Sequence, residues 1–245
     1  MTQAPRIVWF KRDLRINDHA PLLAASRTNA PIIPLYIVEP EYWHQPFASR
    51  RHWHFIHDCL CDLDSGLAEL GQHLVVKVGD SCDVIKQLHL EHDVSHVYAH
   101  EETGNLWTYH RDMAVQKLCQ NHGIALHEAP TNGVVRRLRS RDDWSKIRNA
   151  RMAEKILPRP NMLPSFPSCR SDILPAKNGP IFCDIPIGAV QKGGRKQAVA
   201  DLRSFLNYQS REYLYHISAP GLSEFHCSRL SAHLAWGTLS VREVA

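Results

Sequence analysis

A short polar stretch near the end of the chain combines hydroxyl side chains with a fixed positive charge. It reads CSRLS, residues 227–231, and an apolar helical pattern follows it. The first amides of a helix have no partner within the helix and point outward, so they can bind an anion. Together with Ser228, Ser231 and the guanidinium of Arg229, they supply the donors that a pyrophosphate requires. Tyr215, upstream of the stretch, can close over such a site; the alternative is ordinary helix capping by Ser228.

A second polar stretch lies near the N-terminus, in the sequence VWFKRDLRINDHAPL of residues 8–22. An apolar run ends there in Lys11, Arg12 and Asp13. A basic loop between a buried strand and the N-terminus of a helix can bind an anion or a nucleotide. The alternative is a solvated turn in which Asp13 pairs with Arg15.

A third stretch, HEETGNLWTYHRD of residues 100–112, combines carboxylates with aromatic rings. Glu102 stands where a strand is expected to end, and Trp107 and Tyr109 follow on a helix. Carboxylates can hold the amino groups of a pterin- or purine-like ring, and aromatic side chains can stack on it. Alternatively, Trp107 belongs to the core side of the helix and the acidic residues are charges at its start.

A basic segment, residues 132–152, carries Trp144 among its arginines and lysines. Such a pattern can contact a phosphate backbone. It is equally compatible with a solvated face whose cations pair with the neighbouring acidic residues. The net charge of the chain, +4 at pH 7, favours neither, because a dedicated DNA-binding protein concentrates its charge on one face.

Two of these stretches, at 8–22 and 100–112, fall between elements that alternate regularly in the first half of the chain. Short apolar runs typical of buried parallel strands alternate with amphipathic helical patterns. The longest helix is the clearest, because its apolar residues recur every three or four positions. We expect strands at 7–10, 32–38, 74–78, 94–99 and 124–127, and helices at 18–27, 49–70, 81–92 and 106–122.

This alternation predicts an α/β fold, a Rossmann-like five-stranded parallel sheet with helices on both faces. Ligands of such sheets bind outside the carboxyl ends of the strands, where Glu101 and Glu102 are expected to lie. Asp18 is expected to cap the first helix. Pro34 suggests a bulge or an edge in the second strand, because it lacks an amide donor.

The composition changes near Thr131. A segment rich in arginine is followed by a proline-rich stretch at 158–186 without periodicity, which indicates a long surface connection. A helical pattern resumes at 196–208, and no further strand is expected. The sequence therefore predicts an α/β domain at 1–130, a connection at 131–190 and the beginning of an all-helical domain at 191–245.

Absent features argue against several classes of protein. No apolar run is long enough to span a membrane, and the N-terminus has no secretory signal. Neither GxGxxG nor GxxxxGK[ST] occurs, which argues against a conventional NAD site and a P-loop. The seven cysteines include no CxxC pair, as expected for reduced thiols in a cytoplasmic protein without a metal site.

Taken together, the polar stretches resemble motifs of the DNA photolyase/cryptochrome flavoprotein family. The sequence at 8–22 is similar to the family's N-terminal strand and loop, and GGRKQAVADLRSFL at 193–206 to the entry of its helical domain. CSRLSAHLAWGTLSVREV at 227–244 resembles the flavin-phosphate motif TSRLSPxLxxGxLSxRxV. Here Cys227, a weaker donor, replaces the usual Thr, and Ala232 replaces a common Pro.

The resemblance implies the N-terminal part of a blue-light-driven deoxyribodipyrimidine photolyase, a lyase that repairs pyrimidine dimers in DNA with an electron from reduced FAD. It also implies a monomer whose α/β domain holds an antenna chromophore such as a folate, near Glu102 and Trp107. Folate-binding members carry an Asn-Glu pair where this chain has Trp107 and Thr108. The implied flavin-phosphate ligands are Tyr215, Cys227, Ser228, Arg229, Leu230 and Ser231.

The family's other flavin contacts, its DNA-facing residues and its electron-relay tryptophans lie beyond the position of Ala245. The resemblance therefore implies that these 245 residues alone neither hold FAD tightly nor repair DNA, and no catalytic residue is assigned. Two other functions stay open. One is a cryptochrome-type blue-light photoreceptor without repair activity. The other is a nucleotide-binding α/β module or electron-transfer flavoprotein subunit, which would bind a nucleotide in the dark through residues 1–130.

Overall fold

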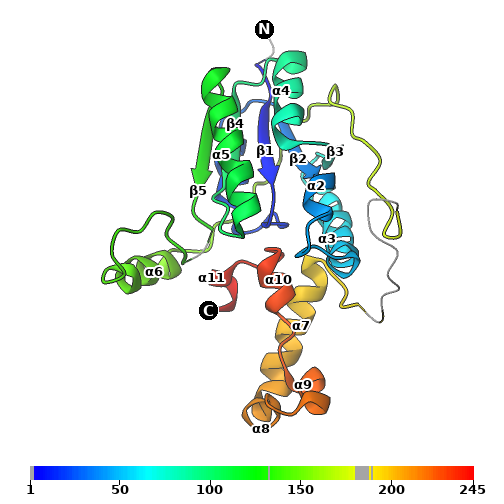
Figure 1. Ribbon diagram of the computed structural model, residues 1–245, viewed down its shortest axis with the longest axis vertical. Coiled ribbons are helices and arrows are strands. Elements are labelled where there is room, and N and C mark those ends of the chain that lie inside the picture. Colours follow the sequence, from blue (N-terminus) through cyan, green and yellow to red (C-terminus); the bar gives the residue numbers. More distant parts are fainter. Residues whose placement is uncertain (1–2, 132, 180–187, 189) are drawn as a thin grey trace.

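The computed structural model describes residues 3–131, 133–179, 188 and 190–245. Strands of its first half form one sheet in the order β3-β2-β1-β4-β5 (Figure 1). All adjacent strands are parallel, so the predicted Rossmann-like sheet is confirmed. The strands are β1 (Arg6–Phe10), β2 (Ile32–Val38), β3 (Val75–Val78), β4 (His96–His100) and β5 (Ala125–Ala129).

Helices cover both faces of this sheet. Val8 and Phe10 of β1 face a core that is shared with the first and third helices, whereas Ile7 and Trp9 face a core shared with the fourth and fifth. Successive side chains of a strand point to opposite faces, and because both faces are buried the strands are apolar throughout. These helices are α1 (Ala20–Ser26), α2 (Pro40–Trp43), α3 (Arg50–Ala68), α4 (Ser81–His92) and α5 (Leu106–Asn121).

The longest helix, α3, follows its predicted pattern closely. Its cap is Ser49, whose hydroxyl accepts the amide of His52 at 3.3 Å. The predicted apolar stripe is buried against the sheet, and it fixes which face of the helix turns inward. The stripe consists of Trp53, Ile56, Leu60, Leu63, Leu67 and, just beyond the helix, Leu70.

The start of α1 differs from the prediction. Its cap is His19, whose Nδ1 accepts the amide of Leu22, and not Asp18. Asp18 has a positive φ of 47°, which turns its carboxylate away from the helix. The carboxylate accepts the amide of Leu157 at 2.9 Å and the Nε of Arg242 at 3.0 Å. A tertiary contact to the end of the chain therefore takes the place of a local cap.

The second strand accommodates Pro34 although it is not an edge strand. β2 is an interior strand, between β3 and β1, so the predicted edge is not observed. However, β3 pairs with β2 only from Leu35 onward. No strand stands beside Pro34 on that side, so its missing amide removes no hydrogen bond to β3.

The connection predicted at 131–190 contains one helix among its described residues, α6 (Trp144–Ala153). Further along, it runs beside the edge strand β3, where the amide of Asp172 donates to the carbonyl of Val76 at 2.8 Å. The hydroxyl of Ser171 accepts the amide of Val76 at 2.9 Å. The connection therefore covers an edge that would otherwise be open to pairing. Residues 180–187 and 189 of this stretch lie outside the described residues.

The remaining helices lie beyond the carboxyl end of the sheet, with α10 close to the end of β1 (Figure 1). In the part of the chain that the structure describes, no strand follows β5, as predicted. None of the described helices has both the length and the apolar character needed to cross a lipid bilayer. These helices are α7 (Arg195–Asn207), a 3₁₀ turn (Gln209–Arg211), α8 (Tyr213–His216), α9 (Pro220–His226), α10 (Ser231–Ala235) and α11 (Val241–Val244).

Contacts at the start of α7 tie this helical part to the α/β part. The amide of Gly194 donates to the sulfur of Cys59 at 3.2 Å, and the amide of Arg195 donates to Asp62 at 2.8 Å, so the start of α7 is held against α3. The helical part has a small core of its own, formed by Ala198, Leu230 and Leu239.

Candidate functional site

The loop that follows β1 is buried. Only 6% of Lys11, 1% of Asp13 and 3% of Arg15 is exposed. The alternative of a solvated turn is therefore wrong. Arg15 donates instead to the carbonyl oxygens of Gly237 at 2.9 Å and Asp18 at 3.1 Å. The charges of this loop thus join parts of the chain that are distant in sequence.

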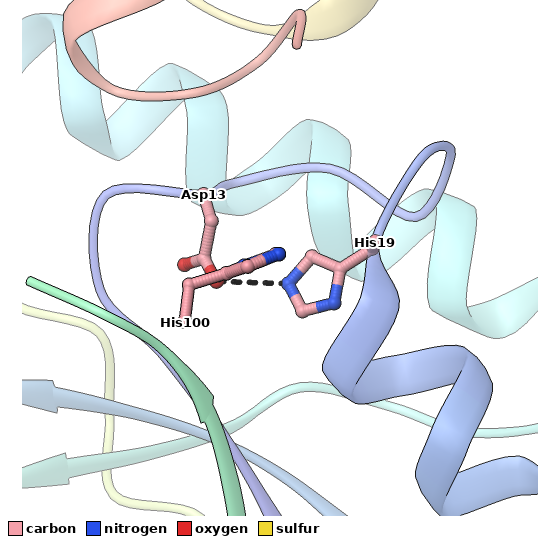
Figure 2. Close-up of side chains that lie close together, drawn as sticks. All are labelled: Asp13, His19 and His100. Atoms are coloured by element: carbon pink, nitrogen blue, oxygen red, sulfur yellow. Dashed lines mark hydrogen bonds and ion pairs between the residues drawn. The ribbon is translucent and has the colours of Figure 1, made fainter. Parts of the chain in front are cut away.

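Asp13 binds two imidazoles that come from different elements (Figure 2). Its Oδ2 accepts the Nε2 of His19 at 2.9 Å and the Nδ1 of His100 at 2.6 Å. Its Oδ1 accepts the amide of Lys11 at 2.7 Å. His19 caps α1 and His100 ends β4, so one carboxylate joins the carboxyl ends of two neighbouring strands to the first turn of a helix.

The hydrogen bonds define the protonation states of this cluster. The Nδ1 of His19 accepts the amide of Leu22 at 3.1 Å, so its Nε2 carries the proton that Asp13 accepts. Burial lowers the pKa of His19 and lowers that of His100 to about 3. Burial also acts to raise the pKa of Asp13, but the facing imidazoles hold it well below its usual range. The cluster is therefore one carboxylate between two neutral imidazoles at neutral pH.

A carboxylate and two imidazoles can also form a metal site, but this cluster does not fit one. Its N–O separations of 2.6 and 2.9 Å are hydrogen-bond lengths. Tetrahedral zinc with bonds of about 2.0–2.1 Å holds its ligand atoms about 3.3 Å apart. A metal on the Nε2 of His19 would also displace the ring's only proton. The hydrogen bonds of the cluster position the loop.

A second buried cluster joins the ends of β1, β2 and β4 to α5. Arg111 of α5 binds Glu39 at 2.9 Å and Glu102 at 3.2 Å. It also binds Asp112 at 2.9 Å, and Asp112 in turn accepts Lys11 Nζ at 2.7 Å. Every charge in this cluster has a partner of opposite sign, as its burial requires.

The indole of Trp9 lies beside both cations of the second cluster. Lys11 Nζ is 4.6 Å from the ring centroid, and the guanidinium of Arg111 is 5.0 Å from it, which adds cation–π attraction. Burial acts to lower the pKa of Arg111, but its carboxylate partners raise it above its ordinary value. Burial raises the pKa of Glu39. The carboxylates at the strand ends are thus held mainly by this chain's own cations.

The two residues that the resemblance places near an antenna lie in different surroundings. Glu102 accepts the amides of Thr103 at 3.0 Å and Gly104 at 2.8 Å, in addition to Arg111. Trp107 packs its edge against Tyr42, with ring centroids 5.4 Å apart. Glu102 and Tyr42 line a cavity of about 30 Å³. That space holds about one water molecule, so no aromatic ring enters it in this conformation.

A larger cavity of about 260 Å³ opens at the carboxyl ends of β1 and β4. The sheet order reverses between these two strands, and such switch points are where open α/β sheets bind ligands. Asp13, His100 and Glu102 line one side of the cavity, and Gly237 and Ser240 line the other. The residues predicted to lie at the strand ends are therefore brought together around one polar cavity.

The segment after α10 is docked directly on the loop after β1. Arg12 Nε donates to the carbonyl of Ala235 at 3.0 Å, and its guanidinium lies 5.3 Å from the ring centroid of Trp236. The amide of Leu14 donates to the carbonyl of Trp236 at 3.1 Å. Gly237 has a φ of +65° and no room for a Cβ. This docking positions the preceding turn, residues 227–231.

The turn at 227–231 leads directly into α10. Arg229 has a φ of 56°, and its carbonyl accepts the side-chain amide of Gln191 at 2.7 Å. Leu230 occupies the cap position of α10, so no side chain caps this helix. Ser228 accepts the amide of Leu230 at 3.4 Å, and it does not cap α10 as the alternative interpretation held. Ser231, the first residue of α10, is exposed.

Beside the turn lies an open cavity of about 510 Å³, which Cys227 and Arg229 line. Ser228 and Ser231 belong to the same turn but do not line this cavity. Tyr215 is 83% exposed on α8, and it is not among the described residues that form the cavity wall. The structure therefore gathers the predicted residues 227–231 and leaves Tyr215 outside.

The basic segment is partly paired with acidic residues. Arg136 binds Glu128 at 2.7 Å and Glu101 at 3.5 Å. The indole nitrogen of Trp144 donates to the carbonyl of Gly133 at 3.0 Å. No residue of α6 is buried. These contacts agree with a solvated face whose cations pair with nearby acidic residues.

The sequence patterns did not identify His19 and His100 of the first cluster or Glu39, Arg111 and Asp112 of the second. A signal existed for His100, because a polar residue at the end of an apolar strand is buried and needs a hydrogen-bond partner. Arg111 stands next to Asp112 and far from the other acids of its cluster. Only the order of strands in the sheet shows which side chains these residues meet.

Comparison with known proteins agrees with the motifs. A family model described as DNA photolyase matches residues 6–144, more than half of the chain. The chain is 30% identical to the deoxyribodipyrimidine photo-lyase of Salmonella typhimurium and 26% identical to cryptochrome DASH of Gloeobacter violaceus. Each alignment covers 97% of this chain and 52% of the relative, so the chain spans about half the length of these curated relatives.

The fold agrees as well. The crystal structure of a bacterial class III photolyase from Agrobacterium tumefaciens superposes with a TM-score of 0.80 at 23% identity, over 100% of this chain and 52% of that one. The matched family model covers the whole parallel sheet and the loop after β1 that organises the site. From its sheet, its motifs and these similarities, the chain belongs to the DNA photolyase/cryptochrome family.

Proposed function

We propose that the chain is the N-terminal part of a blue-light-driven deoxyribodipyrimidine photolyase. The alignment with the Salmonella relative of that name supports the proposal, because it extends over nearly the whole chain. The observation that carries it is the turn at 227–231. This turn precedes a helix that no side chain caps, and docking on the loop after β1 holds it in place.

In this proposal the turn receives the pyrophosphate of FAD. The hydroxyl groups of Ser228 and Ser231 and the guanidinium of Arg229 are the polar donors. Leu230 contributes only its backbone, because its side chain is buried in the core of the helical part. Cys227 borders the adjacent cavity, where its thiol is a weaker donor than a hydroxyl.

Bound and reduced, FAD supplies the electron that splits a pyrimidine dimer. The residues of this chain bind and orient one end of it. Tyr215 is the remaining candidate contact, and its exposed side chain has to move toward the turn to reach a phosphate. Because the chain spans about half of its relatives, we propose that these residues alone hold FAD weakly.

The cavity at the switch point is the proposed site for part of an antenna chromophore. Its volume of about 260 Å³ is close to the lower limit of about 300 Å³ for small-molecule pockets. Glu102 lines it and offers a carboxylate to a polar ring, whereas Trp107, which packs against Tyr42, does not line it. A folate-sized molecule would therefore bind with only one of its ring systems inside.

The test uses the protein produced from its complete coding sequence and an oligonucleotide that contains cyclobutane pyrimidine dimers. We expect the protein to carry a flavin and to remove the dimers under blue light but not in the dark. Photoreduction of the flavin without repair would instead favour a cryptochrome-type receptor. A protein that binds adenine nucleotides in the dark and no flavin would favour the nucleotide-binding module.

A further inference from the structure

Two histidines and a glutamate meet on the surface of the helical part. Glu212 precedes α8, His216 is the last residue of α8, and His226 is the last residue of α9. One carboxylate oxygen of Glu212 lies 3.4 Å from Nε2 of His216 and 3.5 Å from Nδ1 of His226. We propose that these three residues form a binding site for a divalent transition metal such as Zn²⁺.

The separations of the Glu212 oxygen from the two histidine nitrogens suit a metal better than hydrogen bonds. Tetrahedral zinc, with bonds of about 2.0–2.1 Å to histidine nitrogen and carboxylate oxygen, keeps its ligand atoms about 3.3–3.4 Å apart. The observed 3.4 and 3.5 Å are within a few tenths of an ångström of that value. All three donor atoms also lie within 4.8 Å of one another. The three atoms can therefore form one face of a tetrahedron once the two imidazoles turn toward a shared ion.

Two other groups of histidines in the chain have shorter separations between their polar atoms. In the Asp13 cluster the donors approach to 2.6 and 2.9 Å, and hydrogen bonds use every approaching atom. His96 and His127 lie side by side on neighbouring strands with nitrogens 3.0 Å apart, again at hydrogen-bond distance. Glu212, His216 and His226 place two imidazoles and a carboxylate at the longer separations of 3.4 and 3.5 Å.

The three side chains are accessible to an incoming ion. Glu212 is 60% exposed, and His216 and His226 are 26% and 25% exposed. The two imidazole rings lie close together, with centroids 4.2 Å apart. Two imidazoles and one carboxylate leave a fourth position that water can fill, and this donor set suits borderline metals such as zinc.

A metal here would stabilise a weakly packed part of the chain. α8 has four residues and α9 has seven, so neither helix is stable without tertiary contacts. Leu214 is 83% exposed and Phe225 is 67% exposed, so little apolar packing holds them. The metal would join the end of α8 to the end of α9, and its binding energy would become folding energy. Because His226 directly precedes Cys227, it would also hold the turn at 227–231.

The site is tested with the 245-residue chain, freed of metal and titrated with Zn²⁺ by calorimetry. Co²⁺ serves as a spectroscopic probe, because tetrahedral coordination gives intense visible bands. His216→Gln and His226→Gln should each weaken Zn²⁺ binding by about tenfold or more, since even the loss of an outer-shell partner costs that much. Both should also abolish the Co²⁺ bands. Glu212→His should keep the bands, because a third imidazole replaces the carboxylate.

His96→Gln is the matched control, because it removes a half-buried imidazole from the other histidine pair. It should leave the Co²⁺ spectrum and the Zn²⁺ affinity unchanged. Circular dichroism without metal checks that each variant folds, which the exposure of the three side chains leads us to expect. The proposal is overturned if His216→Gln and His226→Gln bind Zn²⁺ like the parent chain, or if the parent shows no saturable binding. The readouts do not involve flavin, so they are independent of the proposed function.

Discussion

Gly237 lies against the backbone of Asp13, so the segment after α10 and the loop after β1 pack main chain to main chain. A Cβ on Gly237 would lie 2.6 Å from the Cα of Asp13 and 2.3 Å from the carbonyl oxygen of Arg12. Asp13 also holds His19 and His100. The segment that follows the turn at 227–231 and α10 therefore rests on the residue that organises the end of the sheet.

Gly237→Ala should destabilise the protein by about 2–4 kcal/mol, because it adds left-handed strain to overpacking. Urea denaturation followed by circular dichroism measures the loss. Gly221→Ala is the matched control, because nothing lies within 4 Å of a Cβ there. That control should be neutral or slightly stabilising, since Gly221 lies in a helix. Equal stability of the two variants would contradict the close packing described above.

Asp13→Asn should cost about 1–3 kcal/mol, although the two side chains have the same shape. Asp13 accepts three N–H groups, from Lys11, His19 and His100. The asparagine NH₂ group would face at least one of these donors. The same substitution at Asp93, which ends α4 with a φ of 56°, should change stability by less than about 0.5 kcal/mol, because asparagine tolerates this conformation. Equal effects at both positions would exclude the special role of Asp13.

The buried imidazole of His100 should make the stability of the protein fall toward acidic pH. Its pKa is about 3 in the folded protein and about 6.5 in an unfolded chain. Below about pH 6.5 the unfolded chain therefore takes up a proton that the folded protein excludes, and stability falls by up to about 1.4 kcal/mol per pH unit. Asp13 acts in the same direction at lower pH, because its lowered pKa stabilises the fold above about pH 4 and this stabilisation is lost as the pH falls further.

His100→Asn tests this dependence, because asparagine can still donate to Asp13 but does not titrate. Urea denaturation between about pH 4.5 and 7.5 should give a smaller loss of stability toward acid in the variant than in the parent chain. His110→Asn is the control, because the side chain of His110 is exposed. If the His100→Asn curve ran parallel to that of the parent, the imidazole would not be neutral in the fold.

Much of the α/β part was predictable because its signals are local. The helix expected at 49–70 is observed at Arg50–Ala68 with Ser49 as its cap. The strand expected at 32–38 is observed with the same bounds. A buried strand needs an apolar run and a helix needs an apolar stripe, and both can be read from consecutive residues.

The site was only partly predictable because its contacts are not local. Asp13 meets His100, 87 residues later in the chain, and Asp18 meets Arg242, 224 residues later. No spacing rule relates such pairs, and they arise because β4 lies beside β1 and the chain end returns to the same loop. Glu102 was located at a strand end, but its partner Arg111 could be recognised only when α5 was placed on the sheet.

Arg229→Asn should weaken FAD binding by about tenfold or more, because a hydrogen bond to a charged group contributes about 1.5–3 kcal/mol. Asparagine accepts the left-handed backbone that Arg229 adopts, with a φ of 56°, so the variant removes the charge without distorting the turn. Flavin fluorescence titration of the protein from its complete coding sequence measures the affinity. Arg203→Asn removes the same charge from an exposed position on α7 and should leave binding unchanged. If both variants bound FAD equally well, the guanidinium of Arg229 would have no part in holding the phosphates, and the proposed orientation of the cofactor would be wrong.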